Sequence, residues 1–173
     1  QLRIIVADPR RTETAGLADL YLPLQPGSDV MLFHGLLHIM LWEGWMDSAF
    51  IAQHTSGFAA LKELVREATP EKVAAICGLP VADLYRAARW MALGGAEEPA
   101  DARRPTLSLY CQGLNQSRSG TANNAALINL HLATGQIGKP GAGPLSLTGQ
   151  PNAMGGREVG GLSNLLSAHR DLS

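Results

Sequence analysis

The chain has few charged residues, few aromatic residues, two cysteines and no long apolar run. Charged side chains make up 17% of its 173 residues and the formal net charge is −1, so it lacks the basic field on which nucleic-acid binding depends. No run of roughly 18 apolar residues occurs, and we therefore expect no membrane span. Cys77 and Cys111 lie far apart in the sequence, which favours buried or half-buried thiols over a metal site.

The last third of the chain is rich in glycine, asparagine and glutamine. Segments 113–116, 133–141 and 148–161 contain few large apolar residues, and we expect that they do not build a core. Glycine lets the backbone come close to a ligand, and the amide side chains supply hydrogen-bonding groups. This composition therefore predicts contact with a large polar ligand.

Short apolar runs alternate with helical patterns along the chain. Turn-forming residues bound the apolar runs, and strands are expected at 2–7, 19–22 and 106–111. Helical periodicity or capping residues predict the following helices: 12–17, 29–43, 47–53, 56–67, 69–77, 81–93, 120–134 and 162–169. The order of elements predicts an α/β fold with parallel strands.

The predicted architecture is a Rossmann-like parallel sheet flanked by helices, with a helical insert and an irregular glycine-rich C-terminal segment. Residues 1–30 and 106–135 would form the Rossmann-like core, and residues 31–94 the insert. Residues 136–173 would form a cofactor or active-site segment. Because residue 1 lies within a strand-like run, we expect a single internal domain of a larger enzyme.

Polar motifs follow each of the three predicted strands. Ligands of open parallel sheets bind outside the carboxyl ends of the strands, so we expect these motifs to meet at one rim. The candidate binding residues are Asp8, Pro9, Arg10, Arg11, Thr12, Gly27, Ser28, Asp29, Gln112, Asn115 and Gln116.

The side chains of these motifs suit different parts of a nucleotide-bearing ligand. The Asp29 carboxylate can accept two hydrogen bonds from a guanine, and Asp8 can accept hydrogen bonds from ribose hydroxyls. Arg10, Arg11 and Thr12 can donate to phosphates, and the amides of the third motif suit a pterin or a pyrophosphate. The structural alternative is that Asp8 forms a turn before Pro9 and that Ser28 or Asp29 caps a helix.

Other candidate sites have simpler explanations. His34 and His38 are four residues apart, as zinc ligands on a helix can be, but the sequence shows no third ligand and helix packing is favoured. Lys139 follows a glycine, but Pro140 stands where a phosphate loop needs serine or threonine. Arg157 lies among glycines, where it could hold a small oxyanion or form a salt bridge with Glu158.

Several motifs together resemble the molybdopterin oxidoreductase family, which contains prokaryotic nitrate reductases, formate dehydrogenases and dimethyl sulfoxide reductases. The resemblance covers nearly the whole chain and is most specific in residues 1–30 and 110–161. The motifs that carry it are DPRRT (8–12), AD (18–19), PGSD (26–29), GLNQ (113–116), LATGQIGKPGAG (132–143) and TGQPN (148–152). Segment 149–161 is most similar to nitrate reductases, particularly the assimilatory catalytic subunit.

The resemblance implies two molybdopterin guanine dinucleotides around one molybdenum. Segments 8–12 and 27–29 match nucleotide-binding loops of the family, Gln112 and Gln116 match a loop near the pterin and metal, and Arg157 matches an arginine that positions substrate. The implied reaction is oxygen-atom transfer from nitrate to reduced molybdenum, with electrons from a donor protein or domain that arrive through an iron–sulfur centre.

The chain departs from the family pattern in two respects. The cysteine cluster for a [4Fe-4S] centre and the molybdenum ligand are not identifiable, and the C-terminal domain of the family is missing, so the isolated fragment is expected to be inactive. Formate dehydrogenase of the same family and a non-redox nucleotide-binding module are the alternatives. We expect a cytoplasmic enzyme, with the periplasm as the alternative if a twin-arginine signal lies upstream.

Overall fold

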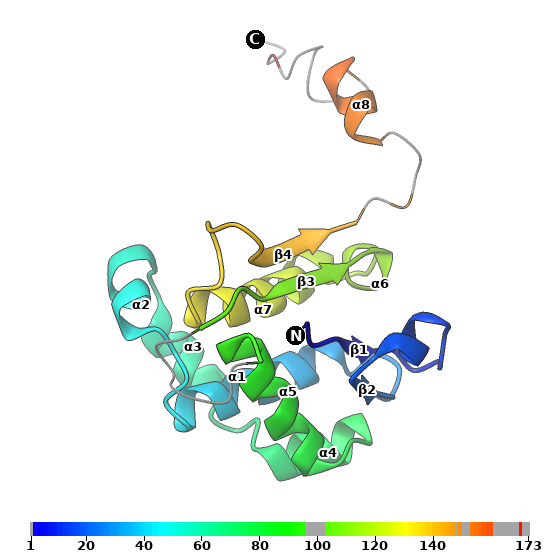
Figure 1. Ribbon diagram of the computed structural model, residues 1–173. Coiled ribbons are helices and arrows are strands. Elements are labelled where there is room, and N and C mark those ends of the chain that lie inside the picture. The colour runs from blue at the N-terminus through cyan, green and yellow to red at the C-terminus, as the bar shows by residue number, and fades with distance from the viewer. Residues whose placement is uncertain (1, 96–102, 148, 150–152, 161–169, 171–173) are drawn as a thin grey trace.

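The structure, a computed structural model, describes residues 2–95, 103–147, 149, 153–160 and 170 (Figure 1). The strands are β1 (Ile5–Ala7), β2 (Leu20–Leu22), β3 (Leu107–Tyr110) and β4 (Gly143–Ser146). The helices are η1 (Thr14–Leu17), α1 (Asp29–Trp42), α2 (Ser48–His54), α3 (Phe58–Leu64), α4 (Pro70–Cys77), α5 (Val81–Leu93), α6 (Gln112–Asn115), α7 (Gly120–Ala133) and α8 (Ala153–Glu158). The helix expected at 162–169 lies outside the described residues.

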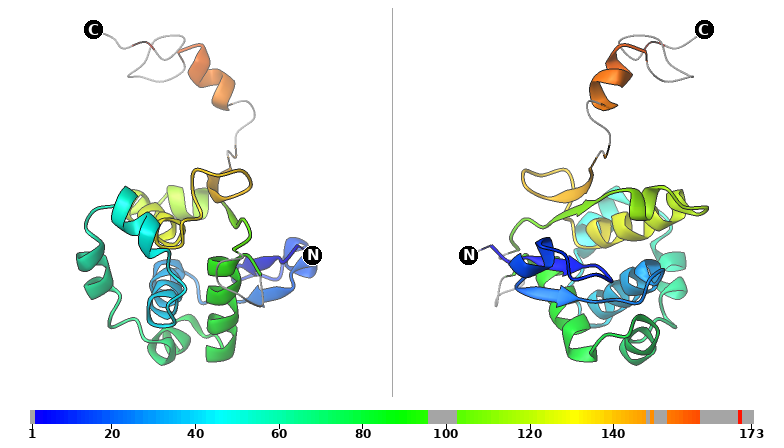
Figure 2. Two further views of the ribbon diagram at one scale, coloured as in Figure 1. Left: turned by 60° about the vertical axis from the view of Figure 1, so that its left-hand side comes forward. Right: turned by 90° about the vertical axis from the view of Figure 1, so that its right-hand side faces the viewer.

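The described strands form two parallel pairs. Strand β1 pairs with β2, beginning at Ile5 opposite Leu20, and β3 pairs with β4, beginning at Leu107 opposite Gly143. The mixed α/β class with parallel strands is therefore confirmed, but the strands belong to two sheets instead of one. Helix α1 packs against α4, α5 and α7 (Figure 2), and β2 contacts α5 whereas β4 contacts α7, so each strand pair lies against a different helix.

Strand β4 lies in a segment for which the sequence predicted irregular structure. Its residues include Gly143 and Pro144, which are uncommon inside strands and hide the pattern. A proline is tolerated at a sheet edge, and β4 has only β3 as a neighbour in the described structure. Helix α7 returns the chain to the side of β3, so tertiary packing determines this strand.

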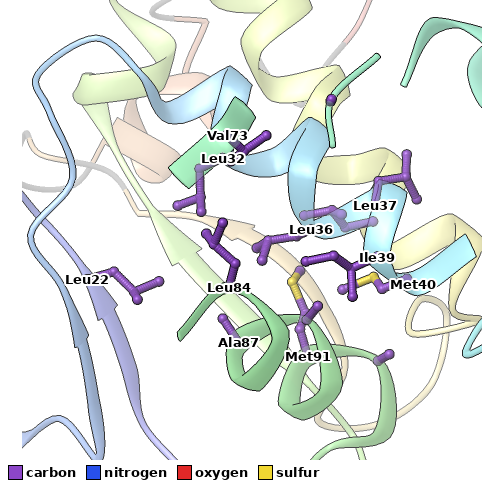
Figure 3. Packing of buried hydrophobic residues seen from close by; sticks show 14 of the residues in the cluster. Leu22, Leu32, Leu36, Leu37, Ile39, Met40, Val73, Leu84, Ala87 and Met91 are labelled. Carbon is purple, nitrogen blue, oxygen red and sulfur yellow. The ribbon is translucent and has the colours of Figure 1, made fainter. Parts of the chain in front are cut away.

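Helix α1 forms the centre of the hydrophobic core. Most of its residues between 32 and 41 are buried, which fits a helix that other elements surround. Figure 3 shows Leu32 and Leu36 of α1 close to Leu84 of α5, and Val73 of α4 lies beside them. At Gly35 an added Cβ would lie 2.6 Å from Val73 Cγ2, so α1 and α4 can approach this closely only because residue 35 is glycine. None of the described helices is both long and apolar enough to cross a membrane.

Local capping interactions explain where several helices begin. The Thr69 hydroxyl accepts a hydrogen bond from Lys72 N at 3.5 Å, and Pro70 opens α4, as the sequence predicts. Asp47 Oδ1 accepts from Phe50 N at 2.9 Å and caps α2. Gly78 ends α4 with φ +70, a conformation that favours glycine.

His38 and Cys77 serve packing in the helical region. His38 Nδ1 donates to Val65 O at 2.9 Å, and its ring stacks on Trp42 with centroids 4.2 Å apart. Burial lowers the pKa of His34. Cys77 and Cys111 are free thiols, as expected. The described residues contain no group of three or more potential metal ligands.

Candidate functional site

Asp8 closes a tight turn at the end of β1. Its Oδ1 atom accepts a hydrogen bond from Arg10 N at 2.7 Å, and its carbonyl oxygen accepts one from the Tyr21 hydroxyl at 3.0 Å. The turn that the Asp8–Pro9 pair predicts is therefore present. Within the described structure, Oδ2 forms no hydrogen bond, so this oxygen can still accept one from a ligand.

The arginines of the same loop give it positive charge. Arg10 and Arg11 are exposed, and neither has an ion-pair partner among the described residues. The Arg11 guanidinium lies 5.9 Å from the centroid of the Tyr21 ring. Thr12 is half-buried and its carbonyl oxygen accepts from Ala15 N at 3.0 Å, which starts η1. The two guanidinium groups are available to an anionic ligand such as a phosphate.

The segment from Gly27 to Asp29 forms the turn between β2 and α1. Gly27 has φ +81, which explains why glycine stands there. Ser28 is buried, and its Oγ donates to Gln25 O at 2.6 Å instead of capping α1. Asp29 is half-buried in the first turn of α1, and its carboxylate has no hydrogen bond or ion pair in the described part of the chain. Of the polar side chains in this motif, only the Asp29 carboxylate is thus left without a partner among the described residues.

The third motif folds into α6, a short helix that directly follows β3. Asn115 Nδ2 donates to Ser146 Oγ at 2.9 Å, which joins α6 to the end of β4. The Gln112 amide contacts the Cys111 thiol and lies so close to Gly149 that a Cβ there would collide with it. Gln116 is exposed, and its side chain makes no hydrogen bond to the described residues.

The loops that follow β1 and β2 lie on the same side of the molecule as α6, the right-hand side in Figure 1. One buried cluster contains a residue from the elements at each of the three motifs, namely Leu22, Leu32 and Leu114. No hydrogen bond joins Asp8, Asp29 and Gln116 to one another in the described structure. The motifs therefore surround a common core, but they extend from two strand pairs instead of one sheet rim.

Two residues of this region were not predicted from the sequence. Tyr21 supports the Asp8 turn and faces Arg11, and Ser146 anchors Asn115. Ser146 was missed because β4 was missed. For Tyr21, the available indication was its place between Leu20 and Leu22, because side chains alternate between the two faces of a strand. The structure agrees, since both leucines are buried whereas Tyr21 is only half-buried.

A shallow hollow of about 460 Å³ lies beside α6. Its lining residues are Asn115, Gly120, Thr121, Asn124, Ala125 and Ile128.

Residues 133–136 are buried, contrary to the expectation for the glycine- and amide-rich segment 133–141. Gln136 is fully buried, its Oε1 accepts from Thr106 N at 3.2 Å and its Nε2 donates to Arg104 O at 2.8 Å. Buried polar groups are tolerated when hydrogen bonds satisfy them. Gln136 therefore holds the start of β3, the strand that carries α6.

His131 extends the buried hydrogen bonds of Gln136. Because Gln136 O can only accept, His131 Nδ1 carries the proton of this 3.0 Å hydrogen bond, and Nε2 accepts from Ser108 Oγ at 2.7 Å. Burial lowers the pKa of His131, and the hydrogen bond to Gln136 O opposes that shift. The neutral ring thus connects α7 to β3.

Arg157 lies in α8, and the structure does not describe its side chain. Its role in positioning substrate therefore remains a prediction from the sequence.

The chain is a mixed α/β protein whose loops after β1, β2 and β3 present carboxylates, guanidinium groups and amides. The sequence profile described as "Molybdopterin oxidoreductase" matches residues 1–172. The chain belongs to the molybdopterin oxidoreductase family, and this membership implies a molybdenum–pterin cofactor.

Several relatives cover nearly the whole chain. It is 48% identical to a nitrate reductase of Synechocystis sp. over 99% of its length and 47% identical to a nitrate reductase of Klebsiella oxytoca over 98%. A formate dehydrogenase subunit of Methanocaldococcus jannaschii is more distant, at 36% identity over 97% of the chain. The chain spans 23%, 18% and 24% of these relatives, respectively.

The fold is also similar to a solved structure. Acetylene hydratase from Pelobacter acetylenicus superposes with a TM-score of 0.67 and 27% sequence identity, over 80% of this chain and 18% of that protein.

Proposed function

We propose that this chain is part of a molybdenum nitrate reductase and contributes to the binding site of a molybdopterin guanine dinucleotide. The observation that carries the proposal is the identity of 47–48% to two nitrate reductases along almost the entire chain, compared with 36% to the formate dehydrogenase subunit. The available side chains support it, because they match the chemistry of the separate parts of this cofactor.

The residues that follow β1 and β2 suit the nucleotide end of the cofactor. Asp29 has an unshared carboxylate that can accept from the two adjacent N–H donors of guanine. Asp8 Oδ2 can accept from a ribose hydroxyl while Oδ1 holds the turn. Arg10 and Arg11 can donate to the phosphates, and Gly27 and Ser28 shape the turn that presents Asp29.

The residues of α6 suit the pterin end. Asn115 is held by Ser146, and Gln116 projects from the end of the helix with an unbonded amide. Gln112 lies beneath Gly149, at the start of the segment that leads to Arg157. When bound, the molybdenum–pterin group supplies oxygen-atom transfer from nitrate. Arg157 would attract and orient the nitrate anion by charge and hydrogen bonding.

Electrons would come from a donor protein or domain through a [4Fe-4S] centre outside residues 1–173. We also propose a cytoplasmic location, which the similarity of segment 149–161 to the assimilatory subunit supports. Fractionation of the native cells tests this location, and recovery of the enzyme from the periplasm would contradict it.

The test uses the full-length enzyme. Nitrate should be reduced to nitrite, formate should not be oxidised, and the purified protein should contain molybdenum and release guanine nucleotide after acid hydrolysis. Asp29→Ala should lower the retained guanine nucleotide roughly tenfold or more, because a hydrogen bond to a charged group contributes about 1.5–3 kcal/mol. The matched control is Glu71→Gln, which changes an exposed acid in the first turn of α4.

Two outcomes would replace the proposal. Formate oxidation without nitrate reduction would assign the enzyme to the formate dehydrogenase branch, which the 36% relative represents. A full-length protein that binds GDP or GTP reversibly, contains no molybdenum and has neither activity would instead be a nucleotide-binding module. Equal guanine content in Asp29→Ala and Glu71→Gln would remove Asp29 from the site.

A further inference from the structure

The strand pair β3–β4 has one covered face. Ser108 points toward α7, where its hydroxyl donates to His131, and Tyr110 packs against the hydrophobic core. Helix α7 connects the two strands and contacts β4. This βαβ unit therefore places its helix on the inner face of the pair.

The opposite face is apolar and exposed. Leu109 lies opposite Leu145 in the register of the pair, and residues two positions apart in a strand share a face. The residues of this leucine face, with their exposed fractions, are Leu107 (49%), Leu109 (58%), Leu145 (48%) and Leu147 (46%). Figure 1 shows α7 on one side of β3 and β4 and no described helix against the other side.

A parallel strand pair with an uncovered leucine face is unusual in a complete, folded protein. Parallel sheets occur almost only where both faces are covered, because crossover helices pack on each side. A sheet of two strands is also too small to be stable without further packing. The four leucines are adjacent to one another, whereas some other exposed apolar residues stand alone. Leu64, for example, lies among the charged residues of α3.

We propose that the leucine face is the docking surface for an apolar helical layer from the part of the same full-length enzyme that lies outside residues 1–173. The chain spans 23% of its Synechocystis relative, so more than three quarters of such a polypeptide must pack elsewhere. The inner helix α7 and an outer helix together would complete the two-sided covering that a parallel sheet requires. This assignment rests on membership of the family and not on the choice of nitrate as substrate.

A helix fits this surface better than a second copy of the chain. The β3–α7–β4 unit repeats the pattern of layered α/β folds, in which helices cover both faces of one sheet. Two copies joined through this face would instead stack sheet on sheet, an arrangement typical of antiparallel sandwiches. We therefore expect the leucine face to be buried within each enzyme molecule.

Hydroxyl-radical footprinting of the unaltered full-length enzyme tests the proposal directly. Peptides with Leu107, Leu109, Leu145 and Leu147 should be oxidised as slowly as peptides from the core of α1, although these leucines are about half exposed in the described chain. Oxidation as fast as that of the same peptides in the urea-unfolded enzyme would overturn the proposal. The readout needs no activity, so it is independent of whether the enzyme reduces nitrate.

Substitution provides a second test in the full-length enzyme. Leu109→Gln combined with Leu145→Gln should lower the thermal midpoint by several degrees, because both side chains would lose apolar burial. Leu64→Gln is the matched control and should leave the midpoint nearly unchanged. Equal midpoints for the double variant and the control would contradict the proposal. A concentration-dependent dimer that the double variant converts to a monomer would assign the surface to a second copy and also overturn it.

Discussion

Replacement of Gln136 by methionine should destabilise the chain by about 2 kcal/mol. The side chain is fully buried and forms one hydrogen bond to Thr106 N and another to Arg104 O. Methionine has a similar length, so little cavity forms, but it can form neither bond. Each lost hydrogen bond contributes about 0.5–1.5 kcal/mol, which gives a total of about 2 kcal/mol for the pair.

Urea unfolding of the 173-residue chain, followed by circular dichroism, measures this loss. For a chain of this size, about 2 kcal/mol corresponds to a decrease of about 4–8 °C in the thermal midpoint. Gln53→Met is the matched control, because Gln53 is exposed on α2 and has no hydrogen-bond partner among the described residues for its side chain. If Gln136→Met and Gln53→Met unfold within about 0.5 kcal/mol of each other, Gln136 does not hold β3 as inferred here.

Three further outcomes follow from the packing and the pKa shifts. Gly35→Ala should destabilise the chain in urea unfolding, because overpacking against Val73 costs about 1–3 kcal/mol and the gain in helix propensity offsets only about 1 kcal/mol. When Gly35→Ala is combined with Val73→Ala, the cost of overpacking should disappear. If the double variant loses the sum of the two single losses in free energy of unfolding, residue 35 does not collide with Val73. Burial lowers the pKa of His131, so below pH of about 6.5 the unfolded chain binds more protons than the folded chain. The free energy of unfolding should therefore fall as pH drops from about 6.5 toward the lowered pKa, and His131→Gln should make this loss smaller in a series of urea titrations. Burial raises the pKa of the Cys77 thiol, so Ellman's reagent should label Cys111 first and Cys77 only after unfolding. Simultaneous labelling of both thiols in the folded chain would show that Cys77 is accessible.

Local features of the fold could be predicted because they depend on neighbours in the sequence. Thr69 and Pro70 predict the start of α4, and Gly78 predicts its end, since caps join residues only three or four positions apart. The turn at Asp8 could be predicted for the same reason, because its hydrogen bond joins residues only two positions apart. Strand β4 could not be predicted this way, because its Gly143–Pro144 start is unfavourable and only pairing with β3 compensates for it.

The candidate site was predictable in composition but not in detail. The sequence identified Asp29 as a carboxylate at a helix start, and the structure leaves that group without a protein partner. The sequence could not show that the Ser28 hydroxyl donates to Gln25 O and is unavailable as a cap. It also could not show that Tyr21 supports Asp8, because these residues meet only when β1 and β2 pair.

The sequence by itself determined the α/β class, most helix boundaries and the family, because periodicity, caps and short motifs are local properties of the chain. Only the tertiary structure decided that the strands form two pairs, that Gln136 is buried and that four leucines share an uncovered face. These features depend on contacts between residues far apart in the chain. Such contacts are selected by the packing of α1 and α7 with their neighbours, and no local pattern encodes them.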